Sequence, residues 1–119
     1  MAEMYLKYGG MPFWAEFMDN FYDKATADTS LQGYFVGKDM QRMKDMQLSL
    51  LEMTMTGTRF DEQAMLERHR NLAITDDLFR HFISLYEAEL LELGVDAEDA
   101  TFMVEQLSGY KKQVVSVPQ

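Results

Sequence analysis

One polar residue lies where the helical pattern expects an apolar one. A helix predicted over residues 39–55 has an apolar face, and at about 100° per residue Gln47 falls at the centre of that face. An inward amide without a partner costs about 1–3 kcal/mol, so Gln47 must meet another polar group or a bound ligand. On this helix alone we favour a hydrogen bond to a buried tyrosine hydroxyl. The face consists of Met40, Met43, Leu50, Leu51 and Thr54, and the opposite side of Arg42, Asp45, Ser49 and Glu52.

Tyr22 is the second polar residue on an apolar stripe. It shares helical spacing with Met18 and Ala25, so its ring is expected to pack inward while its hydroxyl seeks a partner. Taken alone, Tyr22 is an ordinary core residue. If Tyr22 and Gln47 face one cavity, two donors point into apolar surroundings, which suits a small electronegative ligand.

The two histidines form no recognisable metal-binding pair. His69 follows a short helix predicted over residues 61–68, and a histidine there is more often a surface residue or a C-terminal cap than a ligand. His81 also reads as a surface residue. Twelve positions separate them and no H-E-x-x-H pattern occurs, so we expect no dedicated zinc site.

Eleven methionines leave two interpretations open. They can form a soft wall around an irregular space or a cofactor, or simply a methionine-rich core, which is the better account of the methionines by themselves.

Carboxylate pairs at 76–77 and 98–99 lie at expected helix starts and are interpreted as charges that stabilise the helix ends. No phosphate-binding glycine loop or G-x-S-x-G turn is present.

The elements that must position these residues are all helical. No stretch alternates polar and apolar residues as a half-buried strand does. Helices are predicted from Pro12 to Ala25, over 39–55 with a stop at Gly57, over 61–68, and from a Thr75 cap to Leu93 with Gly94 beyond it. Leu31, Tyr34 and Phe35 form a short connector, residues 69–74 are irregular, and a last helix capped by Asp96 continues to Val114.

Composition limits the class of protein. The 119 residues make one domain, 1–119, and 47% apolar residues can build a core without cysteine, which is absent. A net charge of −9 disfavours nucleic acid and anionic membranes as partners. With no signal peptide pattern or long apolar run, we expect a soluble, cytoplasmic protein without membrane insertion.

In order and spacing, several segments resemble the group I truncated hemoglobins, which are small globins with a two-over-two helical sandwich. The matching segments are 5–10 (YLKYGG), 21–24 (FYDK) with Ala27 and Asp28, Leu31 with Tyr34 and Phe35, 37–44 (GKDMQRMK) with Gln47, Gly57, and 65–75 (MLERHRNLAIT) with Phe79. The resemblance implies an all-α truncated globin enclosing a haem. It makes His69 the proximal iron ligand, places Phe35 against the porphyrin, and makes Tyr22 and Gln47 the distal hydrogen-bonding pair.

The sequence departs from that family at several positions. Thr58 replaces the second glycine after the long distal helix, and Leu50 and Leu51 replace phenylalanines that gate a ligand tunnel in some members. Met43 stands at a variable position, where a thioether can approach iron in the ligand-free state. Phe82 stands where groups II and III carry tryptophan, which favours group I.

The resemblance implies a haem protein that reversibly binds O₂ and other diatomic ligands. Non-covalent haem b is the expected cofactor, with NO, CO or sulfide as further ligands. Conversion of NO to nitrate is an expected activity of some members and would need an external reductase, since the chain has no flavin or nicotinamide motif; gas storage and sensing stay open. Expected haem contacts are Phe35, Met43, Leu72, Ile74 and Phe82, with Arg42, Lys44, Arg68 and Arg70 as partners of the haem propionates.

The competing class is a cofactor-free helical interaction module. In that reading, the methionine-rich face binds a partner helix. His69 is then a helix cap, and Gln47 hydrogen-bonds within the core.

Overall fold

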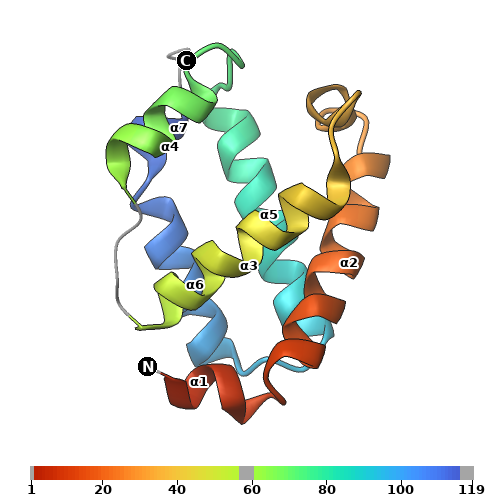
Figure 1. Cartoon of the computed structure of the whole chain (residues 1–119), viewed down its shortest axis with the longest axis vertical. Coiled ribbons are helices and arrows are strands. Elements are labelled where there is room, and N and C mark those ends of the chain that lie inside the picture. The colour runs from red at the N-terminus through yellow and green to blue at the C-terminus, as the bar shows by residue number, and fades with distance from the viewer. Residues whose placement is uncertain (1, 57–60, 116–119) are drawn as a thin grey trace.

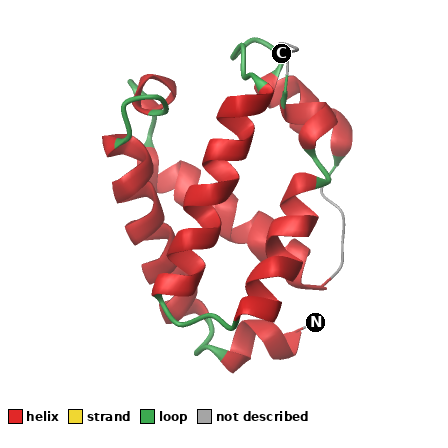
Figure 2. Cartoon of the chain, turned by 180° about the vertical axis from the view of Figure 1, so that it is seen from behind, coloured by secondary structure: helices red, strands yellow, loops and turns green. Residues whose placement is uncertain are grey.

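The computed structural model describes residues 2–56 and 61–115, in which helices are joined by short turns and loops (Figure 1). No strand occurs in either range (Figure 2). Within the described residues no helix is long and apolar enough to cross a membrane. The elements are α1 (Ala2–Lys7), α2 (Met11–Ala27), the 3-10 helix η1 (Gln32–Phe35), α3 (Met40–Thr56), α4 (Glu62–His69), α5 (Asp76–Glu92), α6 (Ala97–Ser108) and α7 (Lys111–Val114).

The long helices form two packed pairs. Helix α2 packs against α3, α5 packs against α6, and α2 also contacts α5 across the layers. In Figure 1, α3 crosses in front of α5. This arrangement confirms the predicted all-α, two-over-two sandwich.

Three predicted helix signals are confirmed. Gly10 adopts φ +71° just before α2, and Pro12 lies in the first turn, where its missing N–H is not needed. The Thr75 hydroxyl accepts a hydrogen bond from the Leu78 N–H at 3.1 Å and so caps α5. Gly94 adopts φ +97° beyond the end of α5, a conformation that favours glycine.

The prediction of one continuous C-terminal helix is wrong. Helix α6 ends at Ser108, and a short α7 begins at Lys111. The N–H of Tyr110 bonds to the carbonyl of Leu107 at 3.1 Å, an i to i−3 bond that tightens the chain into a turn. The apolar stripe continues across this break, because Leu107 and Tyr110 are both buried, so periodicity alone gave no sign of it.

The predicted side-chain cap of α6 is not formed, because its residue contacts the N-terminal segment instead. Asp96 occupies the N-cap position of α6 but makes no side-chain cap bond. Its carboxylate instead pairs with Lys7 of α1 at 2.9 Å, a residue distant in sequence. Helix α1, which we did not predict, is also held by a 3.0 Å hydrogen bond from the Trp14 indole N–H to the Tyr5 carbonyl.

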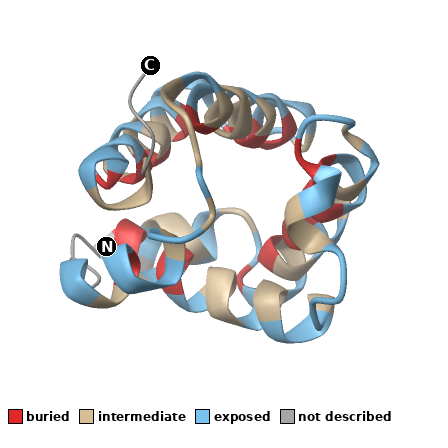
Figure 3. Ribbon diagram, turned by 90° about the horizontal axis from the view of Figure 1, so that it is seen from above, coloured by how far each residue is buried: buried red, intermediate tan, exposed pale blue. Residues whose placement is uncertain are grey.

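The core lies between α2, α5 and α6. Trp14, Phe17 and Phe21 have no exposed surface, and Figure 3 shows the buried residues on the inward sides of the helices. Glu89 is buried in α5, where its carboxylate accepts from Lys24 of α2 at 2.5 Å. Apolar packing and this ion pair fix α2 against α5.

Candidate functional site

A cavity of about 550 Å³ opens between α3 and the segment that runs from α4 into α5. Its volume is typical of sites for cofactors and small molecules. The wall is largely apolar and includes Leu31, Leu50, Met65, Leu78, Phe79 and Leu107.

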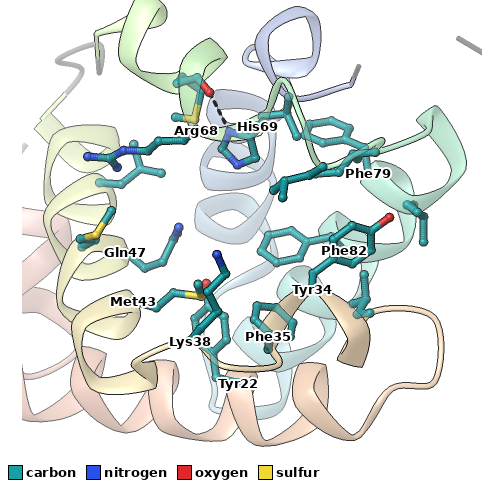
Figure 4. Close-up of a pocket in the computed structure, with 18 of the residues that line it drawn as sticks. Tyr22, Tyr34, Phe35, Lys38, Met43, Gln47, Arg68, His69, Phe79 and Phe82 are labelled. Atoms are coloured by element: carbon teal, nitrogen blue, oxygen red, sulfur yellow. Dashed lines mark hydrogen bonds between the residues drawn. The ribbon is translucent and has the colours of Figure 1, made fainter. Parts of the chain in front are cut away.

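His69 reaches this cavity from the last turn of α4. It is half-buried, and its Nδ1 lies 2.7 Å from the Met65 carbonyl oxygen. A carbonyl can only accept, so Nδ1 donates this bond, and in the neutral tautomer that makes it Nε2 is the nitrogen with the lone pair. Figure 4 shows this bond and the ring at the cavity. In its neutral form the ring therefore presents Nε2 to the cavity, and this is the form in which histidine binds metals.

Tyr22 of α2 lies on the opposite side of the cavity from His69 (Figure 4). Only 2% of the residue is exposed, and its ring meets Phe35 edge-on at 5.7 Å between centroids. Burial raises the pKa of the Tyr22 hydroxyl well above its usual value, so the group stays protonated. Among the described residues the hydroxyl has no hydrogen-bond partner and can donate to a ligand.

Gln47 reaches the same cavity from α3. It is half-buried, as its place at the centre of the apolar face predicted, and the residues on the other side of that helix are exposed. No hydrogen bond to a tyrosine is observed for Gln47 within the described ranges. The favoured interpretation for this helix is thus not what the structure shows, and the amide is available to a ligand.

Most of the other predicted site residues line the cavity. Phe82 also packs edge-on against Phe21 of the core, at 5.1 Å between ring centroids. Met43 and Met46 of α3 line the wall and Met55 is buried, so the methionine face required by an interaction module is turned inward. The predicted residues that line the cavity are Tyr22, Phe35, Arg42, Met43, Gln47, Arg68, His69, Leu72, Ile74 and Phe82.

Two predicted basic residues do not line it. Lys44 lies two positions from Arg42, which is about 200° around the helix, and its Nζ pairs with Asp19 at 3.0 Å. Arg70 is the exposed residue just after α4. Neither residue lines the cavity, so their role as partners of the haem propionates stays a prediction that the cavity lining does not support.

Sequence reasoning also missed several residues. Lys38, two residues before α3, lines the cavity, as does Tyr34 of η1. Tyr110 and Val114 line it too, and their place on the predicted C-terminal stripe was a signal that they face inward. Leu50 lines the cavity while Leu51 lies in the core, and Gly57 and Thr58 fall outside the described residues.

The edge of the cavity is basic although the protein is acidic. Lys38, Arg42 and Arg68 line it, against one carboxylate, that of Asp39. Such groups suit a ligand with carboxylates. An apolar cavity, an imidazole at its wall and three cations among its lining residues together fit a haem, which is the combination that characterises the globins.

Comparison with known proteins agrees with this class. The family model described as bacterial-like globin matches residues 3–116, and the chain belongs to that family. It is 25% identical over 119 residues to a Chlamydomonas moewusii protein named Group 1 truncated hemoglobin LI410, covering 98% of this chain and 70% of that protein. The resemblance to truncated hemoglobins is confirmed, and the family supports a haem-based gas-binding role.

Proposed function

We propose that this globin holds a non-covalent haem b through His69 Nε2 and reversibly binds O₂ and other diatomic ligands on the opposite side. One observation carries the proposal. The free nitrogen of His69 and the available donors of Tyr22 and Gln47 line opposite sides of one cavity.

The residues of the chain have separate tasks in this proposal. The Met65 carbonyl fixes the tautomer and orientation of the His69 ring. The haem, when bound, supplies an iron with an open coordination position. Lys38, Arg42 and Arg68 are proposed to hold the propionates at the basic edge.

Tyr22 and Gln47 are proposed to favour those ligands that carry partial negative charge when bound. A bound haem would supply the position for O₂, and a hydrogen bond that Tyr22 donates to a ligand carrying partial negative charge would contribute about 1.5–3 kcal/mol. Since 1.4 kcal/mol corresponds to about tenfold, the Tyr22 bond slows O₂ release by roughly ten- to a hundredfold. Carbon monoxide develops less charge and gains less.

Retention of O₂ also supports a second, enzymatic candidate. A long-lived O₂ adduct can react with NO, and conversion to nitrate consumes one electron per turnover. The observation that favours it is the pair of donors, Tyr22 and Gln47, at one cavity. An external reductase would have to supply the electron. Sulfide is a further candidate ligand for the same donors.

The test compares ligand release from Tyr22→Phe and from the natural protein by stopped flow. We expect the O₂ dissociation rate to rise by roughly ten- to a hundredfold, while CO dissociation changes much less. Tyr5→Phe, which alters a tyrosine outside the cavity, is the matched control and should change neither rate. An unchanged O₂ rate, or equal changes for O₂ and CO, would exclude Tyr22 from this role.

A further inference from the structure

A ladder of aromatic rings leads from the cavity to the far end of α2. Trp14, Phe17 and Phe21 share the inner face of that helix, and Tyr86 of α5 packs between the last two. Neighbouring centroids lie 4.9–6.0 Å apart along the ladder. Its members in order are Tyr22, Phe21, Tyr86, Phe17, Trp14 and Tyr8.

Four members can be oxidised by one electron under biological conditions. Tyrosine and tryptophan give up an electron far more readily than phenylalanine does. An electron can therefore move stepwise between Tyr22, Tyr86, Trp14 and Tyr8. The phenylalanines of the ladder pack between these oxidisable residues. Tyr22 lines the cavity, whereas Tyr8 lies in the partly exposed turn between α1 and α2.

The tyrosines of the ladder differ in whether an acceptor is available for the phenolic proton. Oxidation of tyrosine is favourable only if its proton leaves with the electron. Tyr22 and Tyr86 are buried, and the described residues offer their hydroxyls no acceptor.

Tyr8 has an acceptor in place. Its hydroxyl donates to the Asp99 carboxylate at 2.5 Å and accepts from the Asp96 N–H at 3.0 Å. Hydrogen bonds from Lys7 and Tyr8 lower the pKa of Asp99 and keep it ionised, and the short bond from Tyr8 places the carboxylate oxygen where it can take the phenolic proton. When one electron has been removed from the ladder, the oxidised state is therefore most stable at Tyr8.

We propose that this ladder is an electron path by which Tyr8 re-reduces the haem site after a hydroperoxide has oxidised it. Reduction of hydrogen peroxide to two waters takes two electrons and two protons. A bound haem would supply both electrons, and Tyr8 would return one of them as its O–H bond breaks and its proton moves to Asp99. Two molecules of a small phenolic or ascorbate-type reductant in solution would complete the cycle, each giving one electron and one proton. One would restore Tyr8, and the other would return the second electron to the haem site. The inference rests on the proposed function, since it requires haem in the cavity.

The same rings could serve only as core packing, and the test must separate the two roles. Tyr8→Phe keeps the ring and removes the oxidisable hydroxyl. Asp99→Asn keeps a hydrogen-bonding partner and removes the proton acceptor. Tyr5→Phe is the matched control, since Tyr5 lies in the same N-terminal segment but takes no part in the ladder.

Haem-loaded proteins receive equimolar hydrogen peroxide with a spin trap, followed by peptide mass spectrometry and electron paramagnetic resonance. We expect the adduct at Tyr8 in the natural protein and in Tyr5→Phe. Tyr8→Phe should lose it, Asp99→Asn should reduce it severalfold, and both should lose haem absorbance severalfold faster on repeated peroxide additions. Thermal unfolding confirms that each variant is folded.

The outcomes are distinct. Adducts confined to residues around the cavity, with Tyr8→Phe bleaching at the rate of Tyr5→Phe, would overturn the electron path and leave the globin function intact. A folded protein that takes up no haem at all would contradict the proposed function, and this inference with it.

Discussion

The packed half of the molecule and the cavity half are built differently. Around α2, α5 and α6 the aromatic side chains of Trp14, Phe17 and Phe21 have no exposed surface. Around α3 and α4, by contrast, Gln47 and His69 remain half-buried beside a cavity of about 550 Å³. The difference indicates that the first half stabilises the fold and the second half is completed by a ligand.

Helix α2 joins the two halves. Its inner stripe supplies core residues as far as Phe21 and then presents Tyr22 at the cavity. The position of the Tyr22 hydroxyl is thus set by a helix that the core holds rigidly. Variants that affect one half and spare the other test this division.

The largest effect is expected from a truncation in the packed half. Phe17→Ala should lower the free energy of unfolding by about 3–5 kcal/mol, because it leaves a cavity among three neighbouring rings. Phe82→Ala, which shortens a ring at the cavity, should cost less in the haem-free protein, about 1–2 kcal/mol. Urea unfolding measures both, and equal losses would contradict the division into two halves.

A smaller effect is expected at the start of α5, beside the cavity. Thr75→Ala removes the side-chain cap from the Leu78 N–H and should cost about 1 kcal/mol. The control is Thr101→Ala, an exposed position within α6, which should be close to neutral. Chemical denaturation compares them, and equal stabilities would show that the cap contributes nothing.

The smallest effect concerns acid stability where α2 ends beside α5. Hydrogen bonds from Ser30 and His81 lower the pKa of Asp28 to about 2 from its ordinary value of 3.8. The group has a lowered pKa in the folded state, so its contribution is present above about pH 4 and is lost as the pH falls towards 2. Asp28→Asn should flatten this part of the stability curve, measured by denaturation at each pH. A curve of unchanged slope would show that the Asp28 contacts do not contribute.

Local sequence signals predicted the helices well where they act within one turn. Gly10 and Pro12 mark the start of α2, and Thr75 caps α5, each through neighbours only a few residues away. The signals failed where a distant residue decided the outcome. The Asp96 carboxylate binds Lys7 instead of capping α6, and no local pattern contains that information.

The candidate site shows the same limit. Helical periodicity placed Gln47 inward. The residues alone favoured a surface position or a helix cap for His69, and only the resemblance to truncated hemoglobins placed His69 and Tyr22 at one site, where both line the cavity. The sequence showed that several basic residues lie near the expected site, but it did not show which of their side chains line the cavity. Lys44 is turned to Asp19, while Lys38 lies at the cavity, because the direction of each side chain depends on its register in the fold.

The most direct test of the account is titration of the haem-free protein with hemin, comparing His69→Ala with His81→Ala. His81 is the matched control, since it lies outside the cavity and bonds to Asp28 at 2.6 Å. We predict that His81→Ala gives the natural absorption spectrum and affinity. His69→Ala should bind hemin at least about tenfold more weakly, which is 1.4 kcal/mol, and should regain the natural spectrum when imidazole is added. Identical spectra and affinities for the two variants would contradict the assignment of His69 as the iron ligand.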